Sequence, residues 1–177
     1  MVVMDIPGLG AVEKDEDTGW YFSDPVVVAV LGGDECEVVL EGYDEDERKE
    51  DFHAVIANFL AASPDVLREA DEALFRYYKD YEEYWLEEGN EPIATAEELW
   101  QRVWFGSEPM VSRDDRGDKA IYVSVECGCD WEVEHGLQIV FKNGLQITKL
   151  GPYDGHLTNV SAYADDSLDG VIYRSHK

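Results

Sequence analysis

An Asn-Gly pair between two apolar runs is the feature that most constrains how this 177-residue chain can fold. In the segment GLQIVFKNGLQITKL, apolar residues recur at every second position on both sides of Asn143 and Gly144. Asn and Gly accept the positive φ angles of a tight hairpin turn, and a period of two is typical of a strand with one buried face. Residues 136–150 are therefore predicted to form an antiparallel β-hairpin.

Further strands are predicted on both sides of a central helical region. Four short segments bounded by Gly, Asp and Pro predict an N-terminal meander of three or four antiparallel strands: GLGAVEKD, GWYFSD, PVVVAVL and CEVVLEG, with LGGDE as the turn between the last two. Strand-like alternation returns in RVWFGSEPMVSRD. In KAIYVSVEC it places Ile121, Val123 and Val125 on one face and Tyr122, Ser124 and Glu126 on the other.

Three helices are predicted between residues 44 and 101. The acidic run at residues 44–51 opens the first, because the helix dipole favours acids in the first turn. Its apolar residues recur with helical spacing at Phe52, Val55, Ile56, Phe59 and Leu60. Thr95 and Glu98 form a capping-box pattern, which predicts a short third helix that ends near Gln101.

The second helix carries a candidate binding surface. It begins with Ser63 as N-cap and Pro64 at the first helical position, and it runs to Glu88. Because only one side of a helix can face a core, Tyr78 is expected at the rim or outside, beside two glutamates. Tyr and Trp are enriched in protein interfaces, so this face predicts a protein-binding surface, and core packing is the alternative. The binding residues would be Tyr78, Tyr81, Glu82, Glu83 and Trp85.

The order of elements is β, then α, then β, which indicates an α+β fold. We expect antiparallel N-terminal strands, two to three central helices, and a C-terminal antiparallel sheet with the Asn-Gly hairpin. Trp100 and Trp104, four residues apart, share a face in a helix or a strand, and both are expected in the core. The length suits one domain. Its parts are a β meander over 1–42, helices over 44–101, strands over 102–150 and an irregular tail over 151–177.

The formal net charge of -26 arises from 40 acidic and 14 basic residues. This balance excludes nucleic acid as a simple electrostatic partner, because the phosphates would be repelled. Residues 1–98 hold 28 acids and 6 bases, whereas residues 99–177 hold 12 acids and 8 bases. An acidic surface attracts basic proteins, so a basic protein is the expected partner. Solubility and adaptation to a salt-rich cytoplasm are the alternative explanations.

The compartment follows from what the chain lacks. No apolar run is long enough to cross a bilayer, and residues 1–10 have no signal-peptide pattern. Three cysteines, an odd number, fit a reducing compartment better than a disulfide framework. We therefore expect a cytoplasmic protein with no membrane partner.

The segment CGCDWEVEHG permits two interpretations. Cys127 and Cys129 share a strand face, and with His135 and His156 they would supply four zinc ligands, although the spacing differs from that of common zinc knuckles. The other interpretation is a turn between strands. In it the cysteines are buried, Asp130 bonds back to the backbone, Trp131 covers the core edge, Gly136 takes a positive φ, and His135 fixes the loop through its ring nitrogens.

Catalysis finds little support in the residues. Glu132, Glu134 and His135 are acid and base groups, and a carboxylate beside the imidazole would tune its pKa. There is no evident nucleophile, no phosphate-binding glycine loop and no G-x-S-x-G elbow. We therefore expect no enzyme and no cofactor, and a metal-dependent enzyme is the alternative.

The stretches CDWEVEHGLQIVFKNG and GPYDGHLT resemble a family of bacterial domains of unknown function with a C-D-W-E-x-E-H-G-L hairpin signature. GLGAVEKDEDTGWYF and LWQRVWF are also similar to it, so the resemblance covers most of the chain. It implies no catalytic residues. Such small acidic domains resemble immunity proteins that neutralise polymorphic toxins, which implies a protein-binding role. The motif positions, with no assigned role, are Trp131, Glu132, Glu134, His135 and Gly136.

Overall fold

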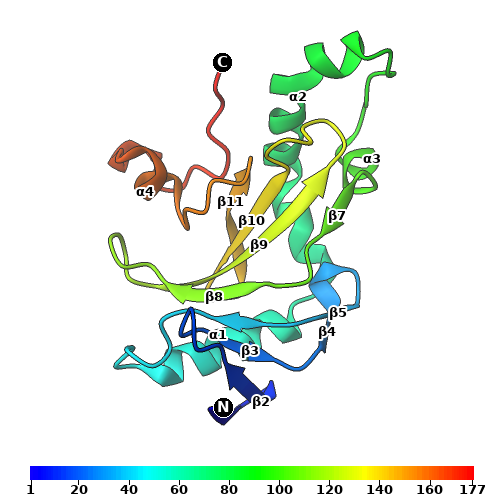
Figure 1. Cartoon of the computed structure of the whole chain (residues 1–177). Coiled ribbons are helices and arrows are strands. Elements are labelled where there is room, and N and C mark those ends of the chain that lie inside the picture. Colours follow the sequence, from blue (N-terminus) through cyan, green and yellow to red (C-terminus); the bar gives the residue numbers. More distant parts are fainter.

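A nine-stranded sheet forms the framework of the molecule, and its strands come from both ends of the chain (Figure 1). The structure, a computed structural model, describes all of residues 1–177. In sheet order the strands are β1 Val3–Ile6, β2 Gly10–Lys14, β3 Tyr21–Ser23, β6 Val39–Leu40, β8 Met110–Arg113, β9 Ile121–Cys129, β10 Leu137–Lys142 and β11 Gln146–Gly151, with β7 Val103–Phe105 paired to β9. All neighbours are antiparallel except β6 and β8. A parallel pair needs a crossover, and the helical segment between these two strands supplies it.

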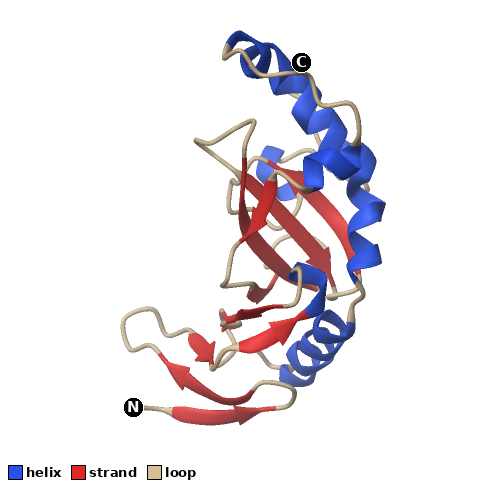
Figure 2. Ribbon diagram, turned by 90° about the vertical axis from the view of Figure 1, so that its right-hand side faces the viewer, coloured by secondary structure: helices blue, strands red, loops and turns tan.

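The helices between β6 and β7 lie on one face of this sheet. The α-helices are α1 Lys49–Ala61, α2 Asp71–Glu87, α3 Ala96–Trp100 and α4 Asn159–Tyr163, and short 3₁₀ helices span Ala29–Leu31, Pro64–Ala70 and Asp166–Leu168. Helix α1 packs on β8 and β9, and α2 packs on β11 and α3. In Figure 2 helices α1 and α2 line the outer side of a crescent and the sheet lines its inner side. The predicted α+β fold is confirmed, and none of the helices has the length and apolar character needed to span a membrane.

Strand alternation decides which residues face the helices. Val111, Val123 and Ile139 lie on β8, β9 and β10 and are fully buried in the core. Their sequence neighbours Met110 and Ser124 point to the opposite face, away from the helices. The predicted division of residues 121–126 between two faces is therefore confirmed.

The Asn-Gly hairpin is present and joins β10 to β11. Asn143 and Gly144 have φ angles of 56° and 69°, and the turn closes where the Leu145 N–H donates to the Lys142 carbonyl at 3.0 Å. Gly144 is also required by packing, because a Cβ there would lie 2.5 Å from the carbonyl oxygen of Val55 in α1. The hairpin turn thus rests directly on the helix backbone.

Helix α1 begins later than the acidic run predicts. Its first residue is Lys49. Asp46 stays outside the helix, because its carboxylate accepts a hydrogen bond from the Arg48 N–H and forms an ion pair with Arg113. Its predicted apolar stripe is buried, apart from the half-buried Leu60.

The starts of the next two helices follow their sequence signals. The Ser63 hydroxyl accepts from the Asp65 N–H, but the first turns are 3₁₀ and α2 proper starts at Asp71. Thr95 caps α3, with its hydroxyl accepting from the Glu98 N–H.

The N-terminal strands form a meander only over β1, β2 and β3. The chain then leaves the sheet to form a separate hairpin of β4 Val26–Val28 and β5 Asp34–Cys36, and it returns as β6 beside β3. Strand β1 lies before the first strand segment that the sequence predicts. It is a four-residue edge strand in which only Met4 and Ile6 face the core, so its alternation is too short to stand out.

Candidate functional site

The predicted binding surface on α2 is mostly structural. Tyr78 is 0% exposed and its hydroxyl accepts a hydrogen bond from the Ile93 N–H at 2.9 Å, so its expected place at the rim is wrong. The reason is that the segment after α2 folds back with α3 and covers a second side of the helix. Trp85 is buried and donates to the Glu91 carbonyl.

The remaining residues of that surface are only partly available. Tyr81 and Glu82 are half-buried, and Glu82 lies 2.8 Å from the Lys79 ammonium. Glu83 is the one residue of the five that is exposed. The acidic, tyrosine-rich face is therefore too small to serve as the main candidate site.

The zinc ligands considered from the sequence do not come together. Cys127 and Cys129 point into the core, where their thiols contact backbone carbonyls, and burial raises the pKa of both to about 12. His135 and His156 are exposed and line the opposite side of the sheet. The structure thus contradicts a site built from Cys127, Cys129, His135 and His156, because β9 separates the thiols from the imidazoles.

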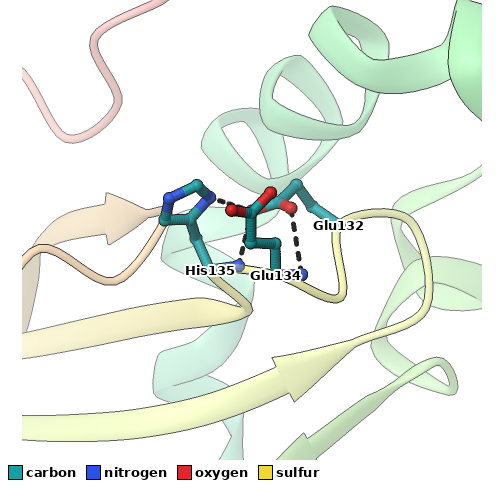
Figure 3. A group of neighbouring side chains, drawn as sticks. All are labelled: Glu132, Glu134 and His135. Atoms are coloured by element: carbon teal, nitrogen blue, oxygen red, sulfur yellow. Dashed lines mark hydrogen bonds and ion pairs between the residues drawn. The ribbon is translucent and has the colours of Figure 1, made fainter.

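A different group gathers in the turn between β9 and β10, where ligand atoms of Glu132, Glu134 and His135 lie within 4.8 Å of one another (Figure 3). One Glu132 oxygen accepts from the Glu134 N–H at 3.1 Å. The other lies 2.9 Å from the His135 backbone nitrogen and 3.0 Å from its Nδ1. These three side chains offer metal-ligand atoms, but the Glu132 carboxylate already closes the turn, and a cation would compete with those contacts.

Trp131 and Gly136 act as the turn interpretation predicts. Trp131 is buried against the rings of Tyr77 and Tyr78. Gly136 has a φ of 65°, its carbonyl accepts from the Tyr77 hydroxyl at 2.6 Å, and a Cβ there would lie 2.5 Å from the Cys127 carbonyl oxygen.

The two polar side chains assigned to fixing the turn behave differently from the prediction. Asp130 pairs with Arg102 at 3.2 Å rather than bonding back to the turn backbone, and Glu132 performs that role. His135 contributes one ring nitrogen, and that nitrogen contacts Glu132.

The inner side of the crescent holds the candidate site, an open groove with a volume of about 1240 Å³. Its floor is the sheet face opposite the helices, with Phe22, Val39, Met110 and Ser124 across β3, β6, β8 and β9. The turn before β10 and the loop after β11 contribute to its lining. The site therefore uses residues from distant parts of the chain, which no local motif reveals.

Trp104 is the aromatic residue that this groove exposes most. It is 54% exposed, so its expected place in the core is wrong. It sits on β7 opposite Gly128, and a Cβ at Gly128 would overlap the indole. The glycine between two buried cysteines was the available signal, because a glycine within a strand often marks close approach by another group.

Solvent-accessible carboxylates without a cationic partner line the same groove. Six such residues of the lining form no ion pair: Glu41, Glu45, Glu108, Asp115, Glu126 and Glu134. A further lining acid, Asp114, is buried and accepts hydrogen bonds from the N–H groups of Arg116 and Gly117.

The cations of the lining do not balance these charges. The lining has no lysine, and its Arg113 is bound to Asp46 and Asp51 at 2.7 and 2.8 Å. Arg116 is the remaining arginine. The groove therefore has a strongly negative potential.

A buried polar network holds one wall of the groove. Gln138 donates to the Ser124 hydroxyl at 2.9 Å and to the His156 carbonyl at 3.0 Å. Its carbonyl oxygen accepts from Lys149, which also lies 2.8 Å from Asp154. Burial lowers the pKa of Lys149, and the hydrogen bond to Asp154 opposes that effect. The loop that carries His156 is thereby fixed to three strands.

The family model of a domain of unknown function, DUF6985, matches residues 8–157. The chain belongs to this family. The DUF6985 match includes every strand of the large sheet except β1, and every residue of the groove lining except Ser161. No curated protein and no solved structure matches the chain.

Proposed function

We propose that this protein is a non-enzymatic binding module whose inner groove takes a basic segment of a partner protein. The observation that carries the proposal is the group of six unpaired, accessible carboxylates that line one groove together with an exposed tryptophan. Carboxylates that line one concavity repel each other, and a cationic segment in the groove would relieve that repulsion. The walls on either side raise the attraction, because a concave surface focuses the field.

The origin of these carboxylates favours a binding role over general salt adaptation. Four of the six come from residues 99–177, the less acidic part of the chain, namely Glu108, Asp115, Glu126 and Glu134. A charge spread for solubility alone would not be expected to concentrate in one groove. Adaptation to a salt-rich cytoplasm remains the alternative for the other acidic surfaces.

Two further features support binding rather than covalent catalysis. The cysteines are buried on the far side of β9, and a thiol with a pKa of about 12 carries almost no thiolate at neutral pH. The Nδ1 of the exposed His135 and its backbone N–H both contact Glu132 of the same turn.

The resemblance to immunity proteins supports a more specific partner. An immunity protein neutralises its toxin by occupying it, and the toxin's binding surface would here be basic. A toxin-like gene immediately upstream of this one would support that assignment.

The proposal is tested by neutralising groove charge at constant shape. The variant Glu108→Gln/Glu126→Gln/Glu134→Gln removes three exposed groove carboxylates. The matched control, Glu83→Gln/Glu87→Gln/Glu88→Gln, removes three exposed carboxylates at the end of α2. Both variants have the same net charge, so any difference in their peptide affinity depends on where the carboxylates were removed.

Binding of a fluorescent, short arginine-rich peptide is followed by anisotropy at several salt concentrations. Exposed charge pairs contribute modestly, so the groove variant should bind roughly 3- to 100-fold more weakly and with a shallower salt dependence, while the control is nearly unchanged. If both variants lose affinity equally, the affinity depends on the net charge of the protein and not on the groove, and the proposal is wrong.

A further inference from the structure

Trp104 lacks the cation that several other aromatic rings of this chain have beside them. Five rings have a lysine or arginine of the same chain near their face: Tyr21, Tyr43, Phe75, Trp85 and Tyr163. The Arg102 guanidinium, for example, lies 5.2 Å from the centre of the Trp85 ring. Trp104 is 54% exposed and has no such cation, although it stands in a strongly acidic concavity.

The position of the indole is fixed by the strand beneath it. Trp104 pairs with Gly128 across β7 and β9, and the indole lies directly on that glycine, where no larger residue fits. The part of the ring turned away from β9 is open to the groove. A ring held in this way loses little freedom when a ligand stacks on it, because its position already exists in the free protein.

A carboxylate lies on the same face of β9 as the glycine beneath the ring. Glu126 precedes Gly128 by two residues, so it projects from the same face of β9 and is the diagonal cross-strand neighbour of Trp104. Diagonal neighbours lie within reach of aromatic and long side chains. Glu126 is exposed and forms no ion pair, so its charge is available to a ligand.

We infer that Trp104 and Glu126 form the binding position for a single arginine side chain of the partner. The guanidinium stacks on the indole while its N–H groups donate to the carboxylate. Arginine suits this position better than lysine, because its planar fork both stacks and bonds two carboxylate oxygens at once. The inference rests on the proposed function, since it names the residue that the acidic groove would recognise.

The test measures whether a single guanidinium reaches this ring. The wild-type protein is titrated with N-acetyl-arginine methylamide and, as a neutral isostere, with N-acetyl-citrulline methylamide, while NMR follows the indole N–H signals. We expect the Trp104 signal to shift with the arginine compound only, and the signals of the other four tryptophans to stay in place. The Trp104 signal is assigned from its loss in Trp104→Phe. Equal shifts with both compounds, or none at Trp104, would overturn the inference.

Variants separate this inference from the proposed function. Trp104→Ala should weaken binding of the arginine-rich peptide about 2- to 30-fold, and Glu126→Gln should reduce the preference for arginine over lysine peptides. Tyr84→Ala removes a similarly exposed ring outside the groove and should leave affinity unchanged. If Trp104→Ala binds like the wild type while the groove-charge variant still loses affinity, the arginine position is wrong and the proposed function stands. If the groove-charge variant keeps full affinity, the proposed function itself is wrong.

Discussion

Replacing Gly136 by alanine tests whether the turn between β9 and β10 is held by a close backbone approach. Two penalties are expected. The φ of 65° costs a residue with a Cβ about 1–2 kcal/mol. The new methyl group would also lie 2.5 Å from the Cys127 carbonyl oxygen, and relieving such overlap typically costs about 1–3 kcal/mol. Together Gly136→Ala should lower the free energy of unfolding by about 2–5 kcal/mol.

The matched control is Gly42→Ala. Gly42 has a φ of 75°, but no atom lies within 4 Å of the place that a Cβ would take there, so only the conformational penalty applies. Urea unfolding, followed by tryptophan fluorescence, gives the loss in the free energy of unfolding for each variant. For a chain of this size, each kcal/mol lost also lowers the Tm by about 2–4 °C. If both variants lose the same stability, the contact between Gly136 and Cys127 does not constrain the turn and the reasoning is refuted.

Three further outcomes are expected. Tyr78→Phe leaves the Ile93 N–H without its acceptor and should cost about 1–3 kcal/mol in urea unfolding, whereas an unchanged stability would place Tyr78 on a surface. The hydrogen bond from Arg113 lowers the pKa of Asp46, so the stability difference between wild type and Asp46→Asn should be full above about pH 4 and shrink as the pH falls further, when unfolding is measured across that range. Metal analysis of protein purified without chelator should give the same zinc content for wild type and Cys129→Ser, and a loss in the variant would restore the cysteine site.

Local signals predicted the parts of the fold that depend on neighbouring residues. Asn143 and Gly144 take the positive φ angles that their residue types favour, and Ser63 and Thr95 cap helices where the sequence places them. The two faces of β9 follow from strict alternation. Each of these features is decided within a few residues along the chain, so no knowledge of tertiary contacts is needed.

The misplaced residues are those whose surroundings depend on distant segments. Tyr78 is buried because the chain around Ile93 returns to cover a second side of α2, and helical periodicity describes only one such side. Trp104 is exposed because the inner face of the sheet stays open at β7, and alternation gives no indication of which face remains open. The groove is formed by segments that lie far apart along the chain, so its carboxylates could not be grouped in advance.

The distribution of cations explains why this groove remains negative. Seven of the 14 lysines and arginines form ion pairs within the chain: Lys14, Arg68, Lys79, Arg102, Arg113, Lys142 and Lys149. Several of these pairs join distant segments, as Arg113 on β8 does with Asp46 and Asp51 before and within α1. The few cations thus stabilise loops and helices against the sheet, and they leave the groove carboxylates unpaired. A cation supplied by a partner, as proposed above, would complete the charge of the groove.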